Sequence, residues 1–420
     1  MLDSLLQQFA RFGVHLGLDR IRELLAALDN PHHRVPIVHV AGTNGKGSVC
    51  AYLSSVLTAA GYRTGRYTSP HLTSWCERIC IDGTPISESD FIATVKRVAA
   101  AIDPAKPTPT QFEIVTAAAF LYFAESNVDI AVFEVGLGGR LDATNVCDRP
   151  LACVITSISR DHWQRLGSTL AEIAFEKAGI LKPERPVILG TLPDDAVAVF
   201  EPRIEELNCP AVWVQPATPL SETEAIYEGL RYPLPLPGDV QLLNSALAIA
   251  TIKQLRQQGW EISDDAICRG MQKARWRGRL EWITWRERRI LVDGAHNVAS
   301  AEVLRRYVET LNTPVTWVMG ILATKDAEGI LKTLLRSRDR VRFVPVPGHS
   351  FTPPEDLQRY AIDLELDLAG CTCDDNVQTA LAAACEDASR LPVLCGSLYL
   401  IGDFFSSETV QTQEIESSAV

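Results

Sequence analysis

Residues 35–48 decide the fold, and they read VPIVHVAGTNGKGS. An apolar run leads into a glycine-rich turn, and the turn ends in Lys46, Gly47 and Ser48. Beyond Ser48 the apolar residues recur at helical spacing. A phosphate-binding loop requires this order of strand, tight loop and helix, because glycines let backbone N–H groups turn towards a polyphosphate. Lys46 would supply a cation for the phosphates, and Ser48 a hydroxyl that can ligate Mg²⁺.

This stretch departs from the usual phosphate-loop pattern at two positions. Ala41 stands where the pattern G-x-x-x-x-G-K-[ST] has its first glycine, and Gly47 separates Lys46 from Ser48. The alternative interpretation is an ordinary glycine-rich turn between a strand and a helix. We favour the phosphate loop because the strand and the helix both fall where the motif requires them.

Length and composition are those of a globular enzyme with two domains. A chain of 420 residues is too long for one typical hydrophobic core. The net charge of −12 argues against a nucleic-acid-binding protein, because phosphate contacts need clustered Lys and Arg. We see no signal peptide and no run that could span a membrane, and the eleven scattered cysteines indicate reduced thiols. We therefore expect a cytoplasmic protein that binds neither nucleic acid nor membranes.

Strands and helices alternate along the chain, which predicts an α/β protein. Residues 1–284 are expected to form a P-loop ATPase-like domain, with N-terminal helices followed by a mostly parallel sheet flanked by helices. Residues 285–405 repeat the alternation and are expected to form a smaller, Rossmann-like α/β domain. Residues 406–420 are polar and acidic, so we expect a disordered tail there.

Polar residues follow the ends of several predicted strands. Glu134 lies near the carboxyl end of a buried-strand run, where a nucleotide-binding enzyme is expected to carry an acidic Mg²⁺ ligand. The next segment, residues 136–145, is dense in glycine and polar side chains and resembles a ligand loop more than a connector. Residues 159–162 and 293–297 are polar loops at the ends of later strands.

Six segments together carry a resemblance to one family. They read GTNGKGS at residues 42–48, SPHL at 69–72, EVGLGGRLDATN at 134–145, EKAGI at 176–180, DGAHN at 293–297 and GSLYLIGD at 396–403. In combination they resemble folylpolyglutamate synthase and dihydrofolate synthase of the Mur ligase superfamily, and the bifunctional bacterial type in particular. The resemblance covers nearly the whole chain. One departure is Val240, which stands where the family usually has His before Gln.

The resemblance implies an ATP-dependent ligase that adds L-glutamate to dihydropteroate, to the glutamate tail of reduced folates such as tetrahydrofolates, or to both. ATP would first phosphorylate a carboxylate, and the amine of glutamate would then attack the acyl phosphate. Such chemistry depends on positioned charge more than on a covalent nucleophile. The partners implied are small molecules, and we expect the chain to act as a monomer.

The resemblance also implies roles for individual residues. Catalytic roles fall to Lys46, Glu134, His162, Lys177 and His296. ATP would be bound by Gly42, Thr43, Asn44, Gly45, Lys46, Gly47, Ser48, Asn244, Arg279 and Asp293. Two Mg²⁺ sites would draw on Ser48, Ser69, Glu134, His162 and Lys177. The pterin part of the substrate would meet Thr110, Leu141, Asp142 and Ala143. Lys177 matches a lysine that is carbamylated in similar enzymes, and carbamylation turns an ammonium into an anionic oxygen ligand suited to a hard cation.

Alternatives stay open for two of these residues and for the function. Lys177 could instead be a solvated helix lysine paired with Glu172 or Asp161. His162 could be a capping or core histidine, because histidine is an unusual ligand for Mg²⁺. A peptidoglycan-precursor Mur ligase shares the loop and the chemistry, but the segments at 69–72 and 134–145 speak against it. A non-ligase P-loop ATPase would need no second domain that supplies an Asp-Gly-Ala-His-Asn loop.

Overall fold

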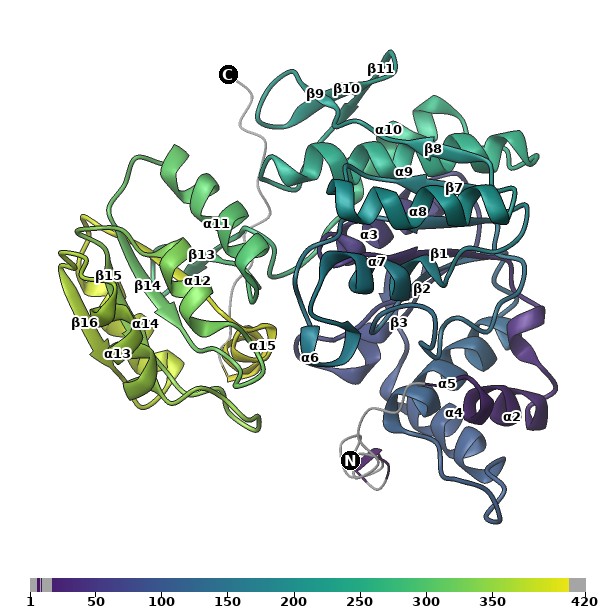
Figure 1. Cartoon of the computed structure of the whole chain (residues 1–420), viewed down its shortest axis with the longest axis horizontal. Coiled ribbons are helices and arrows are strands. Elements are labelled where there is room, and N and C mark those ends of the chain that lie inside the picture. The colour runs from purple at the N-terminus through teal and green to yellow at the C-terminus, as the bar shows by residue number, and fades with distance from the viewer. Residues whose placement is uncertain (1–5, 8, 10–16, 408–420) are drawn as a thin grey trace. The chain divides into compact units, whose positions relative to one another are not determined.

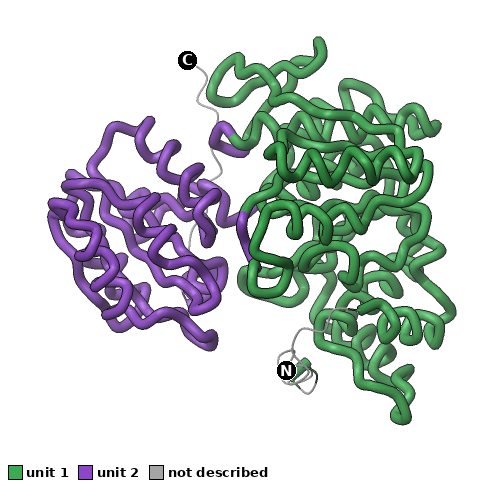
Figure 2. Tube along the Cα trace, in the orientation of Figure 1, with its two compact units in different colours: residues 1–159, 163–235, 240–275 green, residues 160–162, 236–239, 276–420 purple. Residues whose placement is uncertain are grey.

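The computed structural model describes residues 6, 7, 9 and 17–407 (Figure 1). The chain divides into two compact units, which Figure 2 colours separately. Unit 1 comprises residues 1–159, 163–235 and 240–275, and unit 2 comprises residues 160–162, 236–239 and 276–420. Each unit is built around a sheet of its own, and unit 2 is the smaller.

The main sheet of unit 1 has eight strands in the order β4-β3-β2-β5-β1-β6-β7-β8. The strands are β1 Ile37–Ala41, β2 Thr64–Tyr67, β3 Ile79–Ile81, β4 Thr84–Pro85, β5 Ile130–Glu134, β6 Ala152–Ile155, β7 Val187–Leu189 and β8 Ala211–Trp213. The adjacent strands β2, β5, β1, β6, β7 and β8 all pair in parallel. β3 pairs antiparallel with β2, and β4 pairs antiparallel with β3. The predicted, mostly parallel sheet is therefore confirmed. β1 lies between β5 and β6, so the loops after these three strands share one edge.

Helices cover this sheet, and a small second sheet completes unit 1. The helices are α2 Asp19–Ala27, α3 Lys46–Ala59, α4 Glu88–Ala100, α5 Gln111–Glu125, α6 Trp163–Leu166, α7 Leu170–Ala178, α8 Asp194–Glu206, α9 Val240–Gln257 and α10 Asp264–Lys273, with 3₁₀ turns η1 Pro31–His33 and η2 Trp75–Arg78. The small antiparallel sheet holds β9 Thr218–Pro219, β10 Glu224–Tyr227 and β11 Leu230–Pro233. Within the described residues, no helix is both long enough and apolar enough to cross a membrane.

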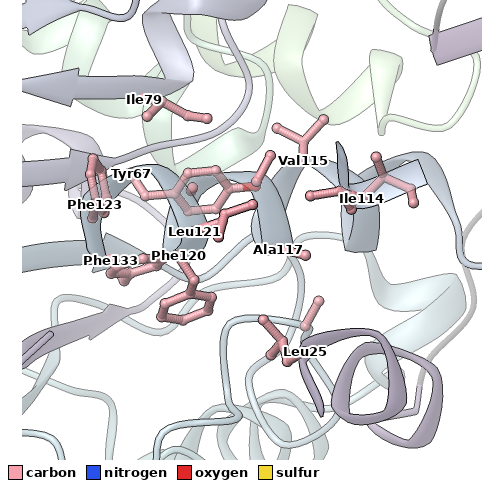
Figure 3. Close-up of a cluster of buried hydrophobic side chains, with 14 of the residues drawn as sticks. Leu25, Tyr67, Ile79, Ile114, Val115, Ala117, Phe120, Leu121, Phe123 and Phe133 are labelled. Carbon is pink, nitrogen blue, oxygen red and sulfur yellow. The ribbon is translucent and has the colours of Figure 1, made fainter. Parts of the chain in front are cut away.

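An aromatic cluster fixes β5 against α5 (Figure 3). Phe120 of α5 stacks on Phe133 of β5 with ring centroids 4.3 Å apart, and Phe123 meets the same ring edge to face at 5.8 Å. The buried Tyr67 lies against Phe133, and its hydroxyl is 2.9 Å from Thr116 Oγ1. Aromatic pairs of this kind contribute about 0.5–1.5 kcal/mol beyond the burial of their area. The cluster thereby holds the strand that ends in Glu134.

Unit 2 contains a six-stranded sheet in the order β12-β13-β17-β14-β15-β16. Its strands are β12 Glu281–Trp285, β13 Arg288–Val292, β14 Val315–Met319, β15 Arg340–Phe343, β16 Gly370–Cys373 and β17 Leu391–Cys395, and its helices are α11 Val298–Thr310, α12 Ala327–Leu334, α13 Pro354–Asp363, α14 Val377–Glu386 and α15 Leu398–Ser407. All pairs except β12–β13 are parallel. β17 lies between β13 and β14, so the loops after these three strands meet at one edge of the sheet.

The domain boundary predicted at residue 284 is wrong. It would cut β12, which pairs antiparallel with β13 in the sheet of unit 2, and the two units divide between Arg275 and Trp276. The β12–β13 hairpin was not predicted from the sequence because its turn is Arg286-Glu287, with φ of +46° and +64°. Such turns normally carry Asn or Gly, and this one gives no turn signal. At the other predicted boundary, Ser406 and Ser407 belong to α15. The rest of the predicted tail, residues 408–420, lies outside the described residues.

Candidate functional site

The phosphate loop, residues 42–48, depends on two glycines with left-handed backbone angles. Gly42 has a φ of +148° and Gly45 a φ of +84°, values that non-glycine residues rarely adopt. A Cβ on Gly42 would collide with the Thr156 hydroxyl, and a Cβ on Gly45 would lie 2.5 Å from Asn244 Oδ1. Both positions therefore require glycine for conformation and for space. The same contact places Asn244, on α9, directly against the loop.

Residues 156–159, which follow β6, form hydrogen bonds with the phosphate loop. The Thr43 amide donates to the Ser157 carbonyl at 2.7 Å, and Thr43 Oγ1 lies 3.0 Å from the Ser159 amide and 3.1 Å from its carbonyl. The Asn44 carbonyl accepts from Thr156 Oγ1 at 2.6 Å and from Ser157 Oγ at 3.1 Å. These bonds fix the backbone of Thr43 and Asn44 against the segment that follows β6.

Helix α3 begins at Lys46, immediately after the loop. Its N-cap is Gly45, and no side chain caps its first turn. The amides of that turn carry the positive partial charge of a helix N-terminus, which suits an anionic group. Ser48 lies buried in the same turn, and its Oγ is 3.4 Å from Gln241 Nε2. Gln241 Oε1 accepts from Asn244 Nδ2 at 3.1 Å. Sequence analysis singled out Val240 and missed Gln241 beside it.

Lys46, Glu134 and Ser69 come together although they lie on three separate segments. Lys46 Nζ donates to the Thr43 carbonyl at 3.1 Å and lies 3.9 Å from the Glu134 carboxylate. Glu134 ends β5, is 5 % exposed, and its Oε2 accepts from the Ser69 amide at 3.4 Å. The Ser69–Pro70 peptide is cis. A buried carboxylate offers oxygen ligands that Mg²⁺ accepts, and Ser69, whose amide bonds to it, carries a hydroxyl of the same ligand class, so these residues fit the predicted ion.

Lys177 is buried against the phosphate loop. Its side chain, from α7, donates to the Gly42 carbonyl at 2.8 Å, and the residue is 5 % exposed. The alternative of a solvated helix lysine is therefore wrong. Glu172, its suggested partner, accepts from Thr169 and Ser168 at the exposed start of α7. A carbamylated lysine keeps one N–H on Nζ, so the bond to Gly42 is compatible with that modification.

No group of three or more His, Cys, Asp or Glu that could hold a metal occurs among residues 6, 7, 9 and 17–407. The predicted Mg²⁺ sites do not require such a group, because they draw on serine hydroxyls and a modified lysine besides Glu134 and His162. Two of the proposed ligands, Ser69 and Glu134, are joined by a hydrogen bond in unit 1.

In unit 2, several polar side chains contact the Asp161 carboxylate. It accepts from Lys325 Nζ at 2.6 Å and from Asn297 Nδ2 at 3.0 Å, and its Oδ2 lies 3.5 Å from His296 Nε2. Burial alone would raise the pKa of Asp161, but the hydrogen bond from His296 and the Lys325 cation outweigh burial and hold that pKa well below its usual range. His162 donates its amide to Asp161 Oδ1 at 2.8 Å, and its side chain is 47 % exposed. Lys325 gave no signal in the sequence because it lies in a loop without a motif.

The Asp293 carboxylate forms a hydrogen bond with the segment that carries Arg279 and so stabilises that segment. Its two oxygens accept from the amides of Leu280 and Ala295, both at 2.8 Å. Burial raises the pKa of Asp293, against the opposing effect of Arg279 and these amides. Gly294 is confined by the same arrangement, since a Cβ there would collide with the Arg279 guanidinium and with Leu398. Two of the predicted ATP contacts, Arg279 and Asp293, are thus neighbours within unit 2.

Thr110 caps α5, the helix that begins beside the 136–145 loop. Thr110 and Glu113 form a capping box, in which the Thr110 amide donates to Glu113 Oε2 at 2.6 Å. Phe112, in the same first turn, lies against Gly136, where a Cβ would collide with its ring. Sequence analysis did not single out Phe112, because an aromatic residue in an apolar helix ordinarily belongs to the core.

The remaining predicted substrate residues lie in the 136–145 loop. Asp142 is buried, and its Oδ2 accepts from the Leu137 amide at 2.8 Å. Its Oδ1 accepts from the Thr144 amide at 3.0 Å and from Thr144 Oγ1 at 2.6 Å. Burial raises the pKa of Asp142, and these bonds oppose the rise. Ala143 is buried, and the Leu141 carbonyl accepts from the amide of Gly17 at 3.3 Å. The hydrogen bonds of Asp142 hold the shape of its own loop.

Comparison with known proteins matches both units. Residues 40–252 match the family model for the Mur ligase middle domain, and residues 278–407 match that for the dihydrofolate synthetase C-terminal domain. A Bacillus subtilis protein named dihydrofolate synthase/folylpolyglutamate synthase is 35% identical over 415 residues, which cover 94% of this chain and 95% of that protein.

Two solved structures are similar over almost the entire chain. One is Mycobacterium tuberculosis folylpolyglutamate synthase complexed with ADP and AMPPCP, with a TM-score of 0.86, 30% identity and coverage of 98% of both chains. The other is a folylpolyglutamate synthase complex with AMPPCP and folate, with a TM-score of 0.84, 34% identity and coverage of 96% of this chain and 98% of that one.

Proposed function

Because this chain belongs to the dihydrofolate synthase/folylpolyglutamate synthase family of ATP-dependent ligases, we propose that it catalyses both reactions that the family name describes. It would add L-glutamate to dihydropteroate, and it would extend the glutamate tail of reduced folates. The observation that carries the proposal is the meeting of Lys46, Glu134 and Ser69 beside a glycine-shaped phosphate loop.

The reaction needs positioned charge at the phosphates. A carboxylate is a poor acyl donor, so the γ-phosphoryl group of ATP passes to it and gives an acyl phosphate and ADP. The amine of glutamate then attacks the acyl carbon, phosphate leaves with the bonding electrons, and the nitrogen loses a proton. Lys46 would hold the β- and γ-phosphates, and the backbone amides from Gly45 into the first turn of α3 would donate to the phosphate oxygens.

Mg²⁺ fits two groups of residues in this proposal. In unit 1, Ser48, Ser69 and Glu134 would hold one ion, and a carbamylated Lys177 would be a further Mg²⁺ ligand of that unit. In unit 2, His162 would be a Mg²⁺ ligand. Bound Mg²⁺ would neutralise phosphate charge. The bond from Lys177 to the Gly42 carbonyl holds the Lys177 side chain beside the phosphate loop, where such a ligand would be needed.

The other predicted residues take supporting roles. Asn244, packed on Gly45, would contact the nucleotide in unit 1. Within unit 2, Arg279 and Asp293 are the residues proposed to bind ATP, and His296 is the residue proposed to act at the reacting groups. Thr110 and residues 141–143 would receive the pterin end of the substrate, on the two elements that Phe112 and Gly136 bring together.

The test measures ADP release by the purified protein with ATP, Mg²⁺ and L-glutamate. One reaction receives dihydropteroate and a second receives a reduced folate, and each is repeated without glutamate. We expect ADP release in both reactions and a loss of most of it when glutamate is omitted. Release with one acceptor alone would restrict the function to that acceptor. Release with neither would contradict the proposal and return attention to peptidoglycan-precursor ligation or a non-ligase ATPase.

Gly294→Ala is expected to weaken nucleotide binding, because the new methyl group would displace the Arg279 guanidinium. We expect the KM for ATP to rise about tenfold, a loss typical of one charge-assisted contact. Gly370→Ala is the matched control, since its Cβ would approach no atom closer than 3.6 Å. A normal KM for ATP in Gly294→Ala, with Tm unchanged, would contradict the role given to Arg279.

A further inference from the structure

His39 is a completely buried histidine at the centre of β1. Side chains alternate along a strand, so His39 shares a sheet face with Ile37 and Ala41. Its register partners are Phe133 of β5 and Cys153 of β6. Burial lowers the pKa of His39 to about 3, so the imidazole is neutral at physiological pH. Among the described residues, Nδ1 finds no hydrogen-bond partner. An unsatisfied buried polar atom destabilises the folded state, so a compensating role is expected for this side chain.

The other ring nitrogen of His39 reaches the 136–145 loop. Nε2 lies 2.8 Å from Thr144 Oγ1, and this hydroxyl lies 2.6 Å from Asp142 Oδ1. The amides of Leu137 and Thr144 also donate to the Asp142 carboxylate. The two backbone amides and the Thr144 hydroxyl all donate to this carboxylate, so both of its oxygens act as acceptors. The single hydroxyl proton of Thr144 goes to Asp142, and His39 must therefore donate its Nε2–H to Thr144.

These hydrogen bonds hold the 136–145 loop around the Asp142 side chain. One carboxylate oxygen holds Leu137 near the start of the loop, and the other holds Thr144 near its end. Asn145 ties the loop to α7 by donating to the carbonyls of Arg140 and Gly179, both at 3.0 Å. His39 adds a tie from β1, the strand that leads directly into Gly42 of the phosphate loop. One strand thus supports both loops.

We propose that His39 is a positioning residue for substrate binding. Its Nε2–H holds the Thr144 hydroxyl, Thr144 holds the Asp142 carboxylate, and residues 141–143 are thereby kept in the conformation that receives the pterin end of the substrate. The inference rests on the proposed function. It explains why a neutral histidine with one unpartnered nitrogen occupies a strand of otherwise apolar residues.

The test compares His39→Leu, which removes the donor, with His39→Gln, whose amide N–H reaches about as far as Nε2. Steady-state kinetics give KM for dihydropteroate, KM for ATP and kcat. For His39→Leu we expect KM for dihydropteroate to rise about tenfold, with KM for ATP and kcat within about twofold of the wild type. His39→Gln should restore KM for dihydropteroate to within about threefold. Equal increases in both KM values, or an unchanged KM for dihydropteroate, would overturn the inference.

Val38→Ala is the control for lost stability, because Val38 is equally buried on the opposite face of β1. It should lower Tm and leave KM for dihydropteroate unchanged. If His39→Leu does not fold, Thr144→Val supplies the test, since at nearly constant volume it deletes the hydroxyl that His39 holds, together with its bond to Asp142. In folded protein, the double variant should raise KM no further than Thr144→Val alone, because the His39 donor has no acceptor left to hold.

Amide hydrogen exchange separates this inference from the proposed function, because it needs no substrate. Removing the His39 donor should speed exchange at the Leu137 and Thr144 amides, which both donate to Asp142. Val38→Ala should leave these two amides as in the wild type. Unchanged exchange in both His39→Leu and Thr144→Val would overturn the inference. A wild-type protein that forms no ADP with dihydropteroate would instead contradict the proposed function.

Discussion

Lys46→Ala is expected to lower kcat for ligation by about three orders of magnitude or more, with the fold intact. The Lys46 ammonium lies between the Thr43 carbonyl of the phosphate loop and the Glu134 carboxylate. Without it, the transferred phosphoryl group would lose the one cationic side chain that the phosphate loop supplies, and backbone amides and bound Mg²⁺ would have to stabilise the charge. Lys46→Arg should not restore activity, because the loop has room for a compact ammonium and a guanidinium is larger and planar.

ADP release and thermal unfolding measured on the same samples check this prediction. Lys96→Ala is the matched control, since Lys96 is an exposed lysine of α4 in the same unit. It should behave as the wild type in both measurements. Near-normal ADP release by Lys46→Ala would contradict the role of Lys46, and so would a loss of activity that merely follows unfolding.

Glu134→Ala is expected to abolish turnover, and Glu134→Gln to lower kcat by two to three orders of magnitude, about the loss seen when a preorganised charge is removed. Glutamine keeps the shape of the side chain and can still accept from the Ser69 amide, but it lacks the negative charge that a Mg²⁺ ligand supplies. Glu134→Gln should therefore also require more Mg²⁺ for half-maximal activity. These effects should occur without loss of Tm, because the residue lies at the end of β5 and outside the aromatic cluster.

A Mg²⁺ titration of ADP release distinguishes the loss of an ion ligand from a general defect. Glu125→Gln serves as the control, because Glu125 forms a surface ion pair with Arg97, and such pairs contribute little to stability. An unchanged Mg²⁺ requirement in Glu134→Gln would argue that Glu134 acts on Lys46 alone. Unfolded Glu134→Ala protein would show that the carboxylate serves the fold.

The strand, glycine-rich loop and helix of residues 35–60 could be predicted from sequence because their signals are local. Strand, glycines, lysine and helix follow one another within residues 35–60, and glycine at Gly42 and Gly45 satisfies backbone angles that neighbouring residues impose. The mostly parallel sheet could be predicted for the same reason, since alternating strands and helices leave few other topologies. The predicted domain boundary at residue 284 was wrong because the nearby Arg286-Glu287 turn gives no local turn signal in the sequence.

The contacts between distant segments could not be predicted in this way. Asp161 and Lys325 are 164 residues apart in sequence, and His39 and Thr144 are 105 apart. Lys177 could be interpreted as solvated or as buried until the packing of α7 placed its amine on the Gly42 carbonyl. Local propensity carries no information about which side chains a sheet edge brings together.

The sequence by itself thus determined the alternation of strands and helices, the glycine-rich loop between β1 and α3 and, through its motifs, the family. Those features depend on residues close together along the chain, where spacing and backbone preference suffice. Only the tertiary structure decided that Glu134 meets Lys46, that Asp142 is enclosed by its own loop, and that His39 supports that loop. The physical reason is that a hydrogen bond forms between atoms about 3 Å apart in space, whatever their separation in sequence.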